Sequence, residues 1–265
     1  KPMTTTARLV ITLAAFATAQ AAPSPRDPQT ATPTQSPSAS DSAETARAAQ
    51  VAALKAEGIT PEADWKRLGE SLWFDPKTKK LIVEAKVVLR QGPLEHLLCL
   101  RRTKEHEAIL STPAVPKQIH AGLLLTGAEP GHPVRFLPKF EPPNGASVAI
   151  ELRWRDKSGT HSADARSWIK DDRAKPEGIL KTDWVFVGSM LYVDPITKQT
   201  VYAADEGDLI TVANFANAIL DLPFASSASD ADRTFEAFTD HIPPVGTVVQ
   251  MVMSPRAVPK PAMPK

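Results

Sequence analysis

The stretch from Leu94 to Val134, LEHLLCLRRTKEHEAILSTPAVPKQIHAGLLLTGAEPGHPV, decides most of what the sequence predicts about the fold. Two short apolar segments, 94–101 and 105–110, are followed by a longer one, 115–127, that begins near a proline and stops at a glycine. The short segments favour two strands joined as a hairpin, and the proline-to-glycine segment favours a helix. A helix through LEHLLCL remains an alternative, because its apolar positions fit either period.

Outside this stretch, two segments share one pattern. SLWFDPKTKKLIVEAKVVL at 71–89 and SMLYVDPITKQTVYAA at 189–204 each have an apolar run, an Asp-Pro pair, a Thr and a Lys, and a second apolar run. Proline presets the backbone for a type I turn, and the aspartate can accept hydrogen bonds from the turn amides. Both segments are therefore predicted to be β-hairpins.

The rest of the domain is predicted from composition and end signals. A helix is expected at 160–172, after a cap at Thr160 or Ser162, and a third helix is expected at 229–240. Segments rich in β-branched and aromatic residues predict further strands at 146–156, 183–189, 208–215 and 247–253. Strands and helices without regular alternation favour an α+β fold: one domain with a mixed or largely antiparallel sheet and two or three packed helices.

The ends of the chain differ in composition from the middle. A short basic and polar start, the apolar run LVITLAAFATAQA and small residues near Ala21 are typical of a secretory signal peptide. Cleavage there would leave an exported protein, periplasmic or extracellular, without a transmembrane anchor. The expected division is a signal peptide at 1–22, a disordered Pro/Ser/Thr linker at 23–42, a short Ala-rich helix at 43–58, the α+β domain at 59–255, and a disordered Pro-rich tail at 256–265.

Charge and cysteine content narrow the function classes. The formal net charge is +1 and no dense Lys/Arg block occurs, so nucleic acid is not an expected partner. Cys99 is the only cysteine. In an oxidising compartment a lone thiol must be buried, metal-bound, reactive or paired with another chain.

A chemical site near Cys99 depends on strand register. Alternation along a strand places His96 and Cys99 on opposite faces, which argues against a local zinc pair. A hairpin turn of two or four residues would place His106 opposite Cys99, close enough to share a proton or a metal. A turn of three or five residues would place Glu105 or Glu107 there instead.

The candidate catalytic pair is thus Cys99 and His106, and the candidate metal ligands are Cys99, His106 and His120, with Glu107 or Glu95 orienting an imidazole. Zinc or another transition metal fits such a set. The favoured interpretation is nevertheless structural, since a free cysteine is among the most frequently buried residue types. No cofactor is predicted under that interpretation.

Several motifs carry a family resemblance: KEHEAIL at 104–110, IHAGLLLTGAEPGHPV at 119–134, and later WVFVGS, ADEGDLITVANFANAILDLPFASS and FEAFTDHIPPVGT. Together they resemble the YdjY domain family of exported bacterial proteins over about residues 70–255. The resemblance implies domain limits, and no reaction or catalytic residue is carried over from it. Some family members carry a ferredoxin-like label, but one cysteine cannot supply the usual four thiolates of an iron–sulfur cluster.

The sequence favours an exported binding or interaction module. The first alternative is a metal-binding or thiol-dependent enzyme that uses Cys99 and His106. The second is a structural component of an envelope or extracellular assembly with a protein partner.

Overall fold

The computed structural model describes residues 59–174, 178–226 and 235–256. The expected signal peptide, linker and Ala-rich helix lie outside these residues, as does the tail from residue 257 onward. No helix among the described residues is long and apolar enough to cross a membrane.

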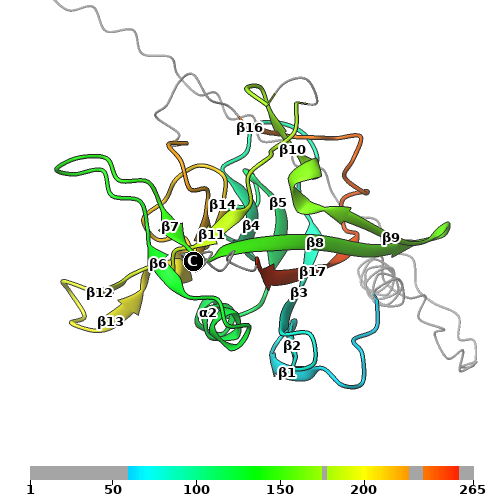
Figure 1. Cartoon of the computed structure of the whole chain (residues 1–265), viewed down its shortest axis with the longest axis horizontal. Helices are drawn as coiled ribbons and strands as arrows, with labels where there is room; N and C mark the ends of the chain where they lie inside the picture. The colour runs from blue at the N-terminus through cyan, green and yellow to red at the C-terminus, as the bar shows by residue number, and fades with distance from the viewer. Residues whose placement is uncertain (1–58, 175–177, 227–234, 257–265) are drawn as a thin grey trace, which may run out of the picture. The chain divides into compact units, whose positions relative to one another are not determined.

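The described chain is built mostly of strands, with one α-helix and two single-turn 3₁₀ helices (Figure 1). The elements are β1 (Lys66–Gly69), β2 (Leu72–Asp75), β3 (Lys80–Val87), β4 (His96–Leu100), β5 (Ala108–Thr112), α2 (Pro116–Leu125), β6 (Pro130–His132), β7 (Asn144–Gly145), β8 (Ser147–Asp156), β9 (Gly159–Asp164), η1 (Ala165–Trp168), β10 (Ile169–Asp171), β11 (Trp184–Phe186), β12 (Leu191–Val193), β13 (Thr200–Tyr202), η2 (Ala203–Glu206), β14 (Asp208–Thr211), β15 (Leu220–Asp221), β16 (Phe235–Ala237) and β17 (Val248–Pro255).

The central sheet closes on itself. Its strands follow the order β3, β17, β8, β11, β15, β14, β4 and β5, and β5 then pairs with β3 to complete a barrel of eight strands. Closure matters because it leaves no unpaired strand edge within the ring. The predicted α+β fold with two or three helices is therefore wrong: the described chain is a mostly β structure with one α-helix.

The second expected helix, at 160–172, is instead a strand followed by a short turn. Residues of β9 alternate between exposed and partly buried, as a half-covered strand requires, and they pair with β8. Asp164 accepts a bond from the backbone N–H of Arg166 and caps only the single turn η1. The polar residues that indicated a helix start thus belong to an exposed strand face.

The third expected helix, at 229–240, falls partly outside the described residues. Its described part contains β16, which pairs antiparallel with β10, so a helix there is wrong. The predicted hairpins are confirmed as β2–β3 and β12–β13. The predicted helix at 115–127 is confirmed as α2, with Pro116 in its first turn and Gly127 just past its end at a φ of 88°.

The hairpin prediction for β4 and β5 is wrong in direction. Both strands exist, but they pair in parallel, with Leu98 beside Leu110 and Cys99 beside Ser111. Residues 101–107, at roughly 3.3 Å each, can extend over about 20 Å and so return along the whole of β4. A tight turn is therefore not required by the length of this connection.

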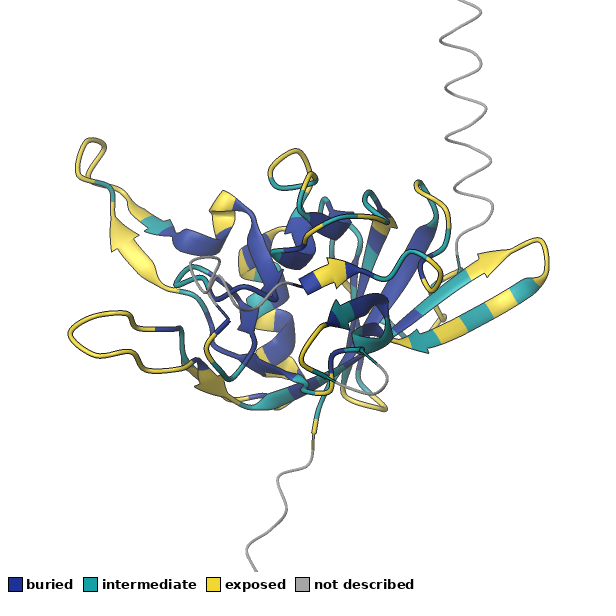
Figure 2. Ribbon diagram, turned by 90° about the horizontal axis from the view of Figure 1, so that it is seen from above, coloured by how far each residue is buried: buried dark blue, intermediate teal, exposed yellow. Residues whose placement is uncertain are grey.

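The barrel interior forms the main hydrophobic core (Figure 2). Its largest fully buried side chains include Trp168, Trp184 and Phe186. Helix α2 packs against β1, β2 and β3, where Gly122 lets the helix approach Leu81; a Cβ at Gly122 would lie 2.4 Å from a Leu81 methyl carbon. The helix therefore covers this side of the barrel (Figure 1).

Candidate metal centre

The parallel register of β4 and β5 brings three potential metal ligands together. His96 opens β4 and pairs with Ala108, so Glu95 and Glu107, each one residue earlier, lie side by side at the amino ends of the two strands. The backbone N–H groups of Glu95 and His96 both donate to the carbonyl oxygen of Glu107, at 3.1 Å each. This shared contact fixes the start of both strands at one point.

The imidazole of His96 is held in one orientation. It is fully buried, and its Nε2–H donates to Oδ1 of Asp208 at 2.6 Å. The ring of Phe215 stacks on it at 5.2 Å between centroids. The other ring nitrogen, Nδ1, is buried without a hydrogen-bond partner among the described residues; with the proton on Nε2, a neutral His96 would present a lone pair there.

One ligand atom from each of Glu95, His96 and Glu107 lies within 4.8 Å of the other two. Ligands at roughly 2.0 to 2.2 Å from a zinc-sized ion are at most about 4.4 Å apart, so small side-chain adjustments suffice to hold one. Two carboxylates and an imidazole suit first-row divalent ions such as Zn²⁺, Mn²⁺ or Fe²⁺. Three protein ligands would also leave a coordination position open.

The electrostatics of the cluster favour a cation. Burial, and then the neighbouring Glu107 carboxylate, raise the pKa of Glu95 above its usual value. Burial also acts to raise the pKa of Asp208, but His96 and Lys104 outweigh it and leave that pKa lowered. The carboxylates of Glu95 and Glu107 lie close together, and a divalent cation between them would relieve their mutual repulsion.

A second layer of hydrogen bonds holds Asp208 in place. Asn217 donates from Nδ2 to Oδ2 of Asp208 at 2.5 Å and to Glu206 at 3.2 Å. Lys104 lies 3.3 Å from Asp208 and over the Phe215 ring. An Asp–His pair of this kind orients the imidazole and raises its basicity where histidine binds a metal.

Residues 72–254 match the sequence profile of the YdjY domain. The chain belongs to the YdjY domain family. The match covers most of the span of the resemblance, about 70–255, and it contains the cluster and all of the barrel except Pro255. Neither the curated proteins nor the solved structures contain a match.

In this YdjY domain, Cys99 and His106 are not brought together. The neighbours of Cys99 across the sheet are Ser111 and Asp208, and burial raises the pKa of its thiol to about 12. The His106 side chain is 77% exposed and lies 3.6 Å from a carboxylate oxygen of Glu107. His106 is therefore not placed as a general base for Cys99, and the raised pKa keeps the thiol protonated near neutral pH.

His120 lies in a separate place, on α2. Its Nδ1 is 3.1 Å from the carbonyl oxygen of Gly188 and 2.9 Å from the hydroxyl of Tyr202, and burial lowers its pKa. It lines an open cavity of about 450 Å³ together with Lys117 and Met190. His120 and Cys99 therefore do not share a site.

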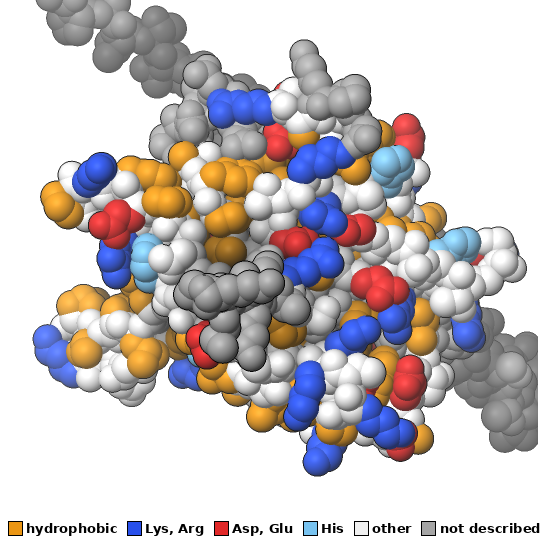
Figure 3. Space-filling view, in the orientation of Figure 1, with side chains coloured by type: hydrophobic (Ala, Val, Ile, Leu, Met, Phe, Trp, Pro, Cys, Tyr) orange, Lys and Arg blue, Asp and Glu red, His pale blue; other side chains and the backbone are white. Residues whose placement is uncertain are grey.

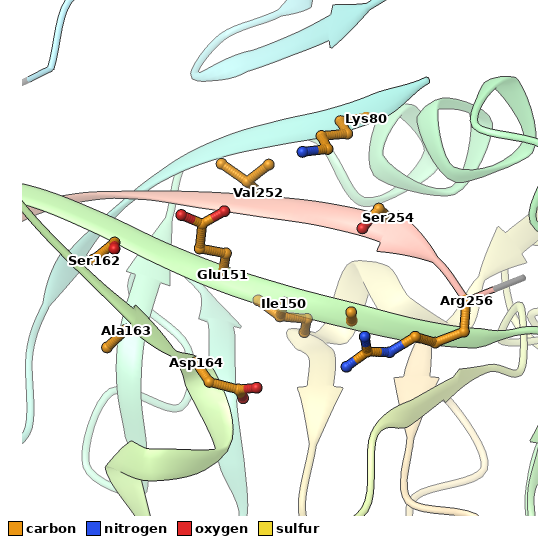
Figure 4. Close-up of a pocket in the computed structure, with 10 residues that line it drawn as sticks. Lys80, Ile150, Glu151, Ser162, Ala163, Asp164, Val252, Ser254 and Arg256 are labelled. Atoms are coloured by element: carbon orange, nitrogen blue, oxygen red, sulfur yellow. The ribbon is translucent and has the colours of Figure 1, made fainter. Parts of the chain in front are cut away.

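Another cavity, of about 430 Å³, lies over β8, β9 and β17 (Figure 4). Charged side chains line this cavity, but several of them already form charged hydrogen bonds with neighbouring side chains. Glu151 accepts two bonds from Arg153 at 2.9 Å, and Arg256 donates to Asp183 at 2.8 Å. This internal pairing makes it a weaker candidate than the cluster at His96.

From the sequence, Glu95 or Glu107 was predicted to orient an imidazole, and neither His96 nor Asp208 was predicted to be a site residue. The structure makes the two glutamates the potential ligands and gives the orienting task to Asp208. One signal was present in the sequence, since Glu95-His96 and His106-Glu107 each adjoin an apolar run.

Proposed function

We propose that this YdjY domain belongs to an exported module that binds one divalent transition-metal ion through Glu95, His96 and Glu107. The proposal rests on two observations: His96 lies in a cluster with two carboxylates, and its buried Nδ1 has no hydrogen-bond partner among the described residues. A buried polar atom usually has a partner, and a bound metal would provide one.

Export is supported by the sequence pattern of residues 1–22, which is typical of a signal peptide. A role in binding is supported by the absence of a reactive thiol arrangement among the described residues, because Cys99 is buried with a raised pKa. The Glu107 carboxylate remains partly exposed, which gives an ion a route into the cluster.

The test is equilibrium dialysis of the purified protein against Zn²⁺ and, separately, Mn²⁺, with the bound metal measured per chain. We expect one ion per chain for at least one of these metals. Glu95→Gln and Glu107→Gln should each weaken binding by more than the roughly tenfold to hundredfold typical of losing an outer partner.

His106→Gln is the matched control, since His106 is an exposed histidine directly beside Glu107. It should bind metal as the wild type does. Circular dichroism should show that all variants fold. Absence of stoichiometric binding in the wild type, or equal binding by the Glu107→Gln variant, would contradict the proposal.

A further inference from the structure

Two segments project from the same end of the barrel (Figure 1). One is the loop between β6 and β7, residues 133–143, and the other is the β12–β13 hairpin with its turn, residues 191–202. We call these the two projections. Figure 2 shows that most of their residues are exposed, unlike the barrel from which they extend.

The ends of the two projections carry exposed apolar side chains. Leu137 is 86% exposed and Ile196 is 88% exposed, the two highest values among the large apolar residues described. Phe136 and Phe140 flank Leu137, and Leu191 and Val193 lie on the hairpin below Ile196. Apolar side chains gathered in this way mark an interaction site.

Each projection also carries a lysine near its most exposed apolar residue, Lys139 in the loop and Lys198 in the hairpin. Within the described ranges, neither lysine forms an ion pair. The nearby carboxylates are already engaged: Glu141 accepts a bond from Arg135 at 2.8 Å, and Asp194 accepts two from turn amides. Figure 3 shows hydrophobic and basic side chains together on both projections.

We propose that the two projections insert their apolar ends, led by Leu137 and Ile196, into the surface of a lipid bilayer with anionic headgroups. The ends are separate and narrow, and each can enter between headgroups by itself, whereas a protein partner would favour one continuous apolar surface. Lys139 and Lys198 would then lie at the level of the anionic headgroups. Two anchoring points on one domain strengthen each other.

The test labels single sites with an environment-sensitive fluorophore. Leu137→Cys and Ile196→Cys variants are suitable, because Cys99 is buried with a raised pKa and should not react in the folded protein. Phosphatidylglycerol–phosphatidylethanolamine vesicles are then added to the full chain. We expect a blue shift and increased emission at both sites.

Val245→Cys is the matched control, since Val245 is an apolar residue that is 63% exposed outside the two projections. Its label should not respond. Replacing Lys139 and Lys198 together with Gln should weaken vesicle binding roughly 30-fold, about fivefold for each lysine.

Several results would overturn the proposal. One is an unchanged emission at sites 137 and 196 on addition of vesicles. Another is the same blue shift in the absence of lipid as the protein concentration rises, which would indicate contact between copies of the chain. A third is a blue shift that a protein extract causes and vesicles do not. The Glu95→Gln variant should respond to vesicles as the wild type does, so this outcome is independent of metal binding.

Discussion

The buried carboxyl of Asp221 leads to a quantitative prediction about pH. Its side chain is fully buried in β15, where Oδ1 accepts bonds from the Leu222 N–H, Thr211 and Asn214 at 2.7 to 3.1 Å. Oδ2 has no hydrogen-bond partner within the described part of the chain. Burial raises the pKa of Asp221 to about 7, and the hydrogen bonds to its carboxyl group offset this only in part.

The direction of the pKa shift determines how the stability of the protein depends on pH. A folded-state pKa of about 7 exceeds the ordinary value of 3.8, so the folded state holds the proton more tightly than the unfolded chain. Stability from this group is complete below about pH 4 and is lost as the pH rises to about 7. A difference of about three between the two pKa values corresponds to at most about 4 kcal/mol.

Asp221→Asn has almost the same shape and does not titrate. Relative to that of the wild type, its free energy of unfolding should therefore increase by up to about 4 kcal/mol between pH 4 and pH 8, so that the variant becomes the relatively more stable protein. Other titrating groups are the same in both proteins, so their contributions cancel in the difference. Urea unfolding followed by tryptophan fluorescence at several pH values measures it.

Asp194→Asn is a suitable control, because Asp194 is an exposed turn residue whose carboxylate accepts a hydrogen bond from the backbone N–H of Thr197, which lowers its pKa. The difference in unfolding free energy between this variant and the wild type should stay nearly constant from pH 4 to pH 8, because the stability contributed by Asp194 is lost only as the pH falls below about 4. If the curves for the wild type and Asp221→Asn remain parallel from pH 4 to pH 8, the reasoning about Asp221 is refuted.

Three further predictions concern the cluster and the cysteine. Asp208→Asn should weaken metal binding by roughly tenfold to hundredfold in calorimetry, because it loses the carboxylate that orients His96; unchanged affinity would count against that task. Cys99→Ala should leave metal affinity unchanged. In the native wild type, the Cys99 thiol should react very slowly with iodoacetamide at pH 8, because at a pKa of about 12 only on the order of 1 in 10,000 thiols is ionised. Rapid labelling of the native protein would contradict this. With a chelator present, the unfolding temperature of the wild type should fall as the pH rises through the raised pKa of Glu95, and in Glu95→Gln this fall should be smaller. Identical curves of unfolding temperature against pH for the two proteins would contradict this prediction.

Local chemistry in the sequence predicted the local elements correctly. The Asp-Pro turns at 75–76 and 194–195 indicated two hairpins, and both exist. Pro116 and Gly127 indicated the limits of α2. These signals work because a turn or a helix end depends mainly on the backbone preferences of adjacent residues.

The direction of β5 and the closure of the barrel depend on distant strands and could not be predicted in this way. β5 pairs with β3 as well as with β4, and a sequence pattern does not show which partner a strand chooses. Polar residues at 160–164 resembled a helix start, but pairing with β8 makes them an exposed strand face.

The site followed from the same long-range pairing. His96 and Asp208 are 112 residues apart in the chain, so their contact could not be read from spacing. The approach of Glu95 to Glu107 requires the parallel register that the hairpin prediction had excluded. Correcting one strand direction therefore moved the candidate site from Cys99 and His106 to the His96 cluster.

The central claim is that Glu95, His96 and Glu107 hold one metal ion. The most direct measurement is an anomalous difference map from crystals of the protein grown with Zn²⁺ or Mn²⁺. The account predicts one strong peak at roughly 2.0 to 2.3 Å from Nδ1 of His96 and from oxygens of both glutamates, with Asp208 still bonded to Nε2. A peak at Cys99 or His120 instead, or no peak within reach of His96, would contradict it.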